Sequence, residues 1–166
     1  MNSNNARDAL LSLLDPVLAT IAALAPAGCH TPAERAALAS ALDESFPVDG
    51  AVVTAIGEAI ERGIAEGWLC DRGEVDARFS RLGKASAASH GLSIDVVRLR
   101  GPGARHMHPK GEVTLGFAVE GAPTFEGRPP GWVFMPPGSS HVPEVVGGRM
   151  NLIYFLPEGA VSWAAT

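Results

Sequence analysis

The sequence predicts a mainly β domain, an antiparallel sandwich or barrel, preceded by about three α-helices. Up to Trp68, apolar residues recur at steps of three and four, the spacing of one helix face. After Trp68, glycine and proline become frequent and short β-rich runs replace the helical periodicity. The change lies near residues 71–75. Residues 1–74 are therefore expected to form a helical N-terminal segment, and residues 75–166 the β domain.

The first helix is expected from Ala6 to about Ala25, with its leucines, valine and isoleucine on one face. The pair Asp15-Pro16 falls inside this range. A proline in a helix removes one backbone hydrogen bond and clashes with the preceding turn. We therefore expect a kink or a restart at this point, with Asp15 capping the part that follows.

The second helix is predicted by the residues of its first turn. Thr31 can cap the amino end, Pro32 suits the first helical position, and Glu34 can bond back to the capping residue. The helix should end near Glu44, because the residue before a proline, here Phe46, disfavours the helical conformation.

The third helix is expected to follow Asp49 and to stop near Gly67. Glu58 is placed to pair with Arg62 on the following turn. The apolar face should consist of residues spaced by four: Val52, Ile56, Ile60 and Ile64. None of the three helices carries a cluster of ligands or nucleophiles, so their expected role is packing.

The β domain should contain several short antiparallel strands separated by glycine and proline turns. The expected strands are Ala77–Ala85, Leu92–Arg100, Val113–Val119, Trp132–Met135 and Met150–Leu156.

Composition excludes several kinds of function. The net charge of −5, with only two lysines, gives no basic surface for nucleic acid. Cys29 and Cys70 lie in different expected segments and predict neither a disulfide framework nor a zinc pair. The amino-terminal residues lack the pattern of a secretory signal, and no run approaches the ~18 consecutive apolar residues of a membrane span. We therefore expect a cytoplasmic protein with no membrane partner.

The chemical centre is the run from Arg105 to Glu112. On a strand, His106 and His108 point to the same side, because successive side chains alternate. Pro109-Lys110-Gly111 reads as a tight turn that can bring Glu112 back toward the imidazoles, and His141 is a further candidate downstream. Three imidazoles and a carboxylate suit a divalent transition ion: iron, manganese, zinc, nickel or copper.

The β part resembles the cupin superfamily, whose two motifs occur here in the correct order. The first is matched by Gly101, His106, His108, Glu112 and Gly121, and the second by Gly131, Pro136, Gly138 and His141. Two departures exist: the first spacer is one residue short, and Val145 replaces the asparagine that commonly follows the last histidine. The resemblance implies a cupin-type double-stranded β-helix that holds a divalent metal through His106, His108, Glu112 and His141.

A narrower likeness points to one family. The chain resembles 4-hydroxylaminobenzoate lyases of bacterial nitroaromatic degradation in several runs: 108–112, 125–132, 136–143, 147–150 and 154–157. This resemblance implies a lyase that converts 4-hydroxylaminobenzoate to 3,4-dihydroxybenzoate with release of ammonia. The implied substrate is a small aromatic carboxylate. Cupin barrels commonly pair, so a homodimer or a higher homo-oligomer is expected.

Other residues are candidates for binding and catalysis. Glu144 can serve as an acid or base and Tyr154 can position a substrate hydroxyl. A substrate carboxylate favours arginine. The candidates are Arg105, which is adjacent to His106 but faces away from it on a regular strand, and Arg98 and Arg100, which share the strand face of His106 only if the intervening Gly-Pro-Gly loop does not reset the register. Four aromatic residues can line a pocket, although core packing is their commoner role: Phe117, Trp132, Phe134 and Phe155.

Two alternatives to the lyase remain open from the sequence. One is an iron-dependent dioxygenase or another metal-dependent cupin enzyme acting on a small aromatic or acidic substrate. The other is a non-catalytic cupin that binds a small molecule and holds a structural or regulatory metal. Oxygen uptake during turnover would favour the first, and protection against heat without product formation would favour the second.

Overall fold

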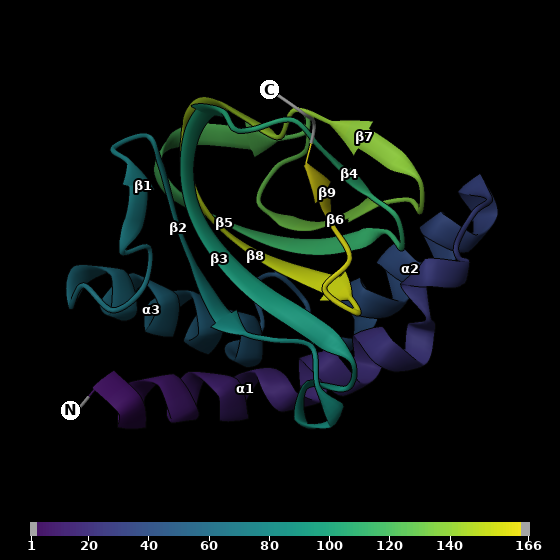
Figure 1. Cartoon of the computed structure of the whole chain (residues 1–166), viewed down its shortest axis with the longest axis horizontal. Helices are drawn as coiled ribbons and strands as arrows, with labels where there is room; N and C mark the ends of the chain where they lie inside the picture. The colour runs from purple at the N-terminus through teal and green to yellow at the C-terminus, as the bar shows by residue number, and fades with distance from the viewer. Residues whose placement is uncertain (1–2, 164–166) are drawn as a thin grey trace.

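The computed structural model describes residues 3–163, in which three α-helices precede two antiparallel sheets. The helices are α1 (Ser3–Leu24), α2 (Pro32–Ser45) and α3 (Ala51–Ala65), with short 3₁₀ turns η1 (Pro26–Gly28) and η2 (Ala87–Ser89). The strands are β1 (Arg72–Glu74), β2 (Ala77–Gly83), β3 (Leu92–Pro102), β4 (His106–His108), β5 (Glu112–Phe125), β6 (Gly131–Met135), β7 (Ser139–His141), β8 (Glu144–Pro157) and β9 (Ser162–Trp163). Figure 1 shows α1 and α3 beneath the large sheet, with β4, β7 and β9 on its other side. The predicted mainly β domain of antiparallel strands, preceded by three helices, is confirmed.

Helix α1 runs without interruption through Pro16, so the expected restart is wrong. Buried Leu14, Val17 and Leu18 lie on both sides of the exposed proline and anchor both halves of the helix to the core. This tertiary packing outweighs the lost backbone hydrogen bond. Asp15 does not act as a helix cap; its carboxylate lies 3.1 Å from Nε2 of His90, just beyond η2.

Helix α1 also meets the length and composition of a membrane span when residues Ser3–Gly28 are taken together. Its apolar residues have another use in this structure, because one face is buried against the rest of the protein. The buried residues of α1 are Leu10, Leu14, Val17, Leu18 and Ile21. Core packing therefore accounts for the apolar residues on this one face of the helix.

The other two helices begin and end as their sequences predict. Thr31 accepts a hydrogen bond from the Glu34 amide, and the Glu34 carboxylate accepts one from the Thr31 amide at 2.8 Å, which completes the capping box of α2. Helix α3 ends before Gly67, which has a positive φ of 80°. The predicted ion pair between Glu58 and Arg62 is present at 3.8 Å.

The buried face of α3 differs from the prediction at one position. Ile56, Ile60 and Ile64 are buried, but Val52 is 38% exposed and Val53 takes its place in the core. Because a helix face includes both three- and four-residue steps, the stripe moves by one residue at its amino end.

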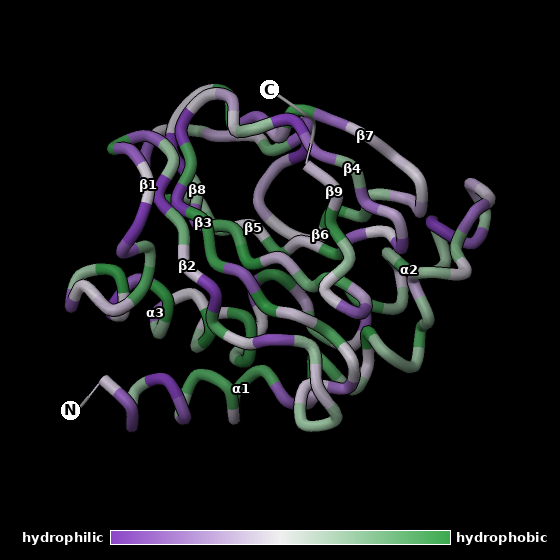
Figure 2. The backbone as a smooth tube through the Cα atoms, viewed as in Figure 1, coloured by the Kyte–Doolittle hydropathy of each residue, from purple (hydrophilic) through white to green (hydrophobic). Residues whose placement is uncertain are grey.

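The large sheet is antiparallel, with the order β1-β2-β3-β8-β5-β6. Side chains alternate along its strands and separate two faces. Ile94, Ile153 and Phe155 pack in a core shared with the helices, whereas Leu152 and Tyr154 belong to a second apolar cluster on the opposite face. Figure 2 shows the hydrophobic stretches gathered where α1 and α3 meet the sheet. The sheet thus has one face covered by helices and one face available for a site.

The small sheet has the order β7-β4-β9, with the histidine strand β4 in the centre. All five strands predicted from the sequence are present, with shifted ends. Strands β1, β7 and β9 were not predicted. Each has only two or three residues, which are too few to show the alternation of apolar and polar side chains that predicts a strand.

Replacing Ile60 by Ala is expected to lower the free energy of unfolding by ~2–5 kcal/mol, because it leaves a cavity in the core shared by the helices and the sheet. The matched variant Val52→Ala removes a half-exposed side chain of the same helix and should change that free energy by less than about 1 kcal/mol. Chemical denaturation measures both. Equal losses would mean that α3 presents a different face to the sheet.

Candidate metal centre

Strands β4 and β7 bring three histidines together. His106 and His108 are buried on one side of β4, while Met107 between them is directed to the other side. Strand β7 pairs antiparallel with β4, and this register places His141 directly opposite His106. Two residues of one short strand and one residue of its neighbour therefore supply the whole cluster.

The Nε2 atoms of the three rings face one another. Nε2 of His141 lies 3.0 Å from Nε2 of His108 and 3.3 Å from Nε2 of His106. Two nitrogens that share an ion at about 2.0–2.1 Å would be separated by about 2.9–3.4 Å, so the cluster has the dimensions of a metal centre. Lone pairs this close repel one another unless a proton or a cation lies between them. The three imidazoles can therefore bind a metal ion.

The outer ring nitrogens each face an oxygen atom. Nδ1 of His106 donates to the Ala104 carbonyl at 2.8 Å, Nδ1 of His141 lies 3.2 Å from a carboxylate oxygen of Glu126, and Nδ1 of His108 lies 3.5 Å from one of Glu112. The two carboxylate contacts lack hydrogen-bond geometry. A proton on Nδ1 leaves Nε2 with its lone pair, which is the arrangement of metal-bound histidines.

The surroundings favour the neutral form of His106 and His108. Burial lowers the pKa of His106. Burial, together with repulsion from the other two rings, lowers the pKa of His108 to about 3. Neutral imidazole is the form that coordinates a cation, so protons do not compete for His108 near neutral pH.

Glu112 lies beside the cluster and not within it. Its carboxylate accepts a hydrogen bond from the Thr114 hydroxyl at 2.8 Å and faces the outer nitrogen of His108. Burial raises the pKa of Glu112 to about 8, which leaves the metal-free side chain protonated near neutral pH. The structure thus brings together three of the four predicted ligands and places the fourth next to them.

A cavity of about 750 Å³ opens against the cluster. His106, Glu112 and Tyr154 line it. Tyr154 is buried, and burial raises the pKa of its phenol well above the ordinary value. Two predicted catalytic residues, Arg105 and Glu144, are exposed and do not line the cavity. The backbone amide of Glu144 donates to the Glu126 carboxylate at 3.0 Å, so this position supports the residue that faces His141.

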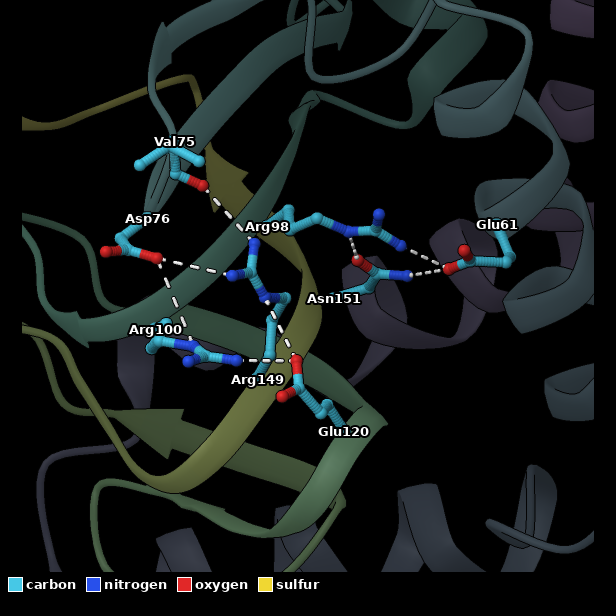
Figure 3. A network of polar contacts seen from close by, with 8 residues as sticks. All are labelled: Glu61, Val75, Asp76, Arg98, Arg100, Glu120, Arg149 and Asn151. Atoms are coloured by element: carbon cyan, nitrogen blue, oxygen red, sulfur yellow. Dashed lines mark hydrogen bonds and ion pairs between the residues drawn. The ribbon is translucent and has the colours of Figure 1, made fainter.

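Arg98 and Arg100, the other candidates for binding a carboxylate, belong to a network away from the cavity (Figure 3). Arg98 pairs with Glu61 of α3 and donates to the Asn151 amide oxygen at 2.9 Å. Arg100 donates to Glu120 at 2.5 Å. Arg98 and Ile94 point to the same side of β3, the side that packs against the helices, and Arg98 therefore points away from the cavity.

Most of the residues that line the cavity were not predicted from the sequence. The cations that line it are Arg72, Arg81 and Lys84, and the aromatic side chains are Phe79, Tyr154 and Trp163. The four aromatic residues proposed for a pocket pack instead against the core shared with the helices: Phe117, Trp132, Phe134 and Phe155. Alternation along β2, where Phe79 and Arg81 share a side, was an available signal. Glu126 and Trp163 reach the site by long-range pairing, which leaves no local pattern.

Comparisons with known proteins identify similar sequences. The family described as PnbB, 4-hydroxylaminobenzoate lyase, matches residues 22–163. A 4-hydroxylaminobenzoate lyase from Pseudomonas putida is 29% identical, over 74% of this chain and 80% of that protein. Another from Nocardioides sp. (strain LMS-CY) is 32% identical, over 64% of this chain and 69% of that protein.

Solved structures with partial similarity include cupins. An RmlC-like cupin protein from Ralstonia eutropha JMP134 has a TM-score of 0.42 and 14% identity, over 55% of this chain and 62% of that one. A cupin-like protein from Thermotoga maritima MSB8 has a TM-score of 0.38 and 17% identity, over 57% of this chain and 84% of that one.

The contact between Glu126 and His141 predicts an effect on metal affinity. Glu126→Gln keeps the shape of the side chain but removes the charge that faces Nδ1 of His141, and should weaken metal binding by about 10–100-fold. Titration with cobalt(II), followed by its visible absorption, measures this affinity. Glu144→Gln, an equal change at an exposed carboxylate, serves as the control and should bind like the wild type. Equal affinity of the Glu126 variant would refute the positioning role.

From the raised pKa of Glu112 we predict that metal binding releases a proton. Near pH 7 the imidazole of His108 is already neutral, whereas Glu112, with its pKa of about 8, still carries a proton that a nearby cation would expel. Roughly one proton should leave per ion at about pH 7, falling toward none at about pH 9, where Glu112 is already ionised. Calorimetry in buffers of different ionisation enthalpy counts these protons. The prediction fails if Glu112→Gln releases as many as the wild type.

Proposed function

The chain belongs to the 4-hydroxylaminobenzoate lyase family, and from this premise we propose that it is a metal-dependent lyase that converts 4-hydroxylaminobenzoate to 3,4-dihydroxybenzoate with release of ammonia. One structural observation carries the proposal: the cluster of three buried imidazoles lies against a cavity large enough for a small aromatic acid. Location in the cytoplasm and assembly into a homodimer or a higher homo-oligomer stay predictions from the sequence.

The proposed reaction consumes one water molecule and is neutral in redox terms. The N–O bond and the bond from nitrogen to the ring break, and two ring carbons gain oxygen. The electrons released by ring hydroxylation are taken up by cleavage of the N–O bond. No external oxidant is needed, and this separates the lyase from the dioxygenase alternative.

We assign the metal ligands to His106, His108 and His141, with Glu112 as the fourth, and expect iron, manganese, zinc or nickel. The donor set fits such an ion because the inner nitrogens converge and the outer ones face oxygens. When bound, a divalent ion supplies a Lewis acid that polarises an oxygen and lowers the pKa of a water molecule.

The chain's own residues supply binding and proton transfer. Tyr154 keeps its phenolic proton, because burial raises its pKa, and lies in the cavity wall, from which it can donate a hydrogen bond to a substrate oxygen. Leu99 and Leu156 give the wall an apolar surface that excludes water around the substrate ring. Arg105 and Glu144 lie outside the cavity, so we give neither of them a catalytic step.

We assign the substrate carboxylate to Lys84 instead of an arginine. Arg81 is already held by Asp95 through two hydrogen bonds of 2.7 and 3.1 Å. Arg72 lies over the ring of Phe79 and 3.7 Å from Asp71. Among the cations that line the cavity, Lys84 alone has no ion-pair partner in residues 3–163. Its ammonium is therefore available to a carboxylate.

Purified protein incubated with 4-hydroxylaminobenzoate without oxygen is expected to form ammonia and 3,4-dihydroxybenzoate in equal amounts. His106→Ala should abolish both turnover and bound metal, which elemental analysis measures, because it removes one of three converging nitrogens. His30→Ala changes an exposed histidine outside the cluster and should leave both unchanged.

Other outcomes of the same experiment would overturn the proposal. Turnover that requires oxygen would favour the dioxygenase, and binding of the substrate with no product would favour a binding protein. Full activity in a metal-free preparation would show that the reaction does not need the metal.

A further inference from the structure

The C-terminal strand forms part of the wall of the site. Strand β9 pairs antiparallel with β4, with Trp163 opposite His106 and Ser162 opposite Met107. The indole of Trp163 lies against the imidazole of His106, with ring centroids 5.1 Å apart and planes inclined by 55°. A residue 57 positions beyond His106 in the sequence is thus its immediate neighbour in space.

Trp163 lines the cavity and is nevertheless 64% exposed. Indole is among the largest apolar side chains, and its exposure to water costs free energy that a ligand could recover by covering it. Phe79, which lines the same cavity from β2, is also 45% exposed. In contrast, the aromatic residues on the helix face of the sheet are largely enclosed by apolar neighbours. The accessible aromatic surface beside His106 is therefore suited to contact a planar ring.

We propose that Trp163 is a specificity-determining residue whose indole packs against the ring of an aromatic carboxylate bound beside His106. The proposal rests on the proposed function for the identity of the substrate, and on the position of Trp163 for the contact. An aromatic ring gains from this contact both by burial of apolar area and by ring-to-ring attraction. A saturated ring of the same size and charge gains only by burial.

The test uses the full-length, metal-loaded protein and two probes, 4-hydroxybenzoate and cyclohexanecarboxylate, whose affinities are measured by calorimetry. Trp163→Leu keeps an apolar side chain on β9 but removes the aromatic ring. It should lower the affinity for 4-hydroxybenzoate by about ten-fold and the affinity for cyclohexanecarboxylate by no more than about two-fold. Trp163→Phe keeps an aromatic ring and should retain the affinity for 4-hydroxybenzoate within about three-fold.

Fluorescence locates the contact. In the wild type, 4-hydroxybenzoate should quench tryptophan emission, and the quenching should disappear in Trp163→Phe. The matched variant Trp68→Phe removes an indole that does not line the cavity and should leave the quenching intact. Metal content in each variant shows whether the histidine cluster has survived the substitution.

The outcomes separate this inference from the proposed function. Selective loss of 4-hydroxybenzoate binding in Trp163→Leu supports the contact even if 4-hydroxylaminobenzoate is not turned over, in which case only the proposed function fails. Unchanged affinity and an unchanged KM for 4-hydroxylaminobenzoate in Trp163→Leu, in an active and metal-loaded enzyme, overturn the inference. Equal weakening of both probes also overturns it, because the ring would then contribute nothing specific.

Discussion

The convergence of three imidazole nitrogens in a buried place is the constraint on which the rest of the structure depends. It requires each ring to point its Nε2 inward, and the protein meets this requirement with oxygens near the outer nitrogens; for His106 and His108, burial also lowers the pKa. It also requires β4 to be held on both edges, by β7 and β9. The small sheet is therefore a frame for the cluster, and the large sheet supplies the wall opposite.

The large sheet divides structural from functional side chains by strand parity. Along β3, Ile94 and Arg98 face the helices, whereas Asp95 and Val97 face the cavity. The Arg98–Glu61 pair and the Asn151 amide then join the sheet to α3. The helix-facing side of these strands therefore serves packing alone, whereas on the other side Leu99 and Tyr154 belong both to the second apolar cluster and to the cavity wall.

Local patterns allowed the sequence to predict the helices, the capping box of α2, five strands and the histidine cluster. His106 and His108 follow from two-residue alternation, and His141 from the resemblance to a cupin motif. What escaped prediction depends on distant partners. Pro16 is tolerated because buried residues hold both halves of α1, and Glu126 reaches the histidines from the turn after β5 and Trp163 from β9. The position of Arg98 was not predicted correctly, because the loop before β4 prevents the sequence from showing whether Arg98 and His106 point to the same side of the sheet.

The pairing of β9 with β4 also has a consequence for biosynthesis. A ribosome makes β9 after every other strand of the two sheets, so β4 has only one of its two neighbours until the last described residues emerge. The helical layer, the large sheet and the three histidines can all form before this happens. The strand that carries Trp163 is therefore the last described part of the site to leave the ribosome.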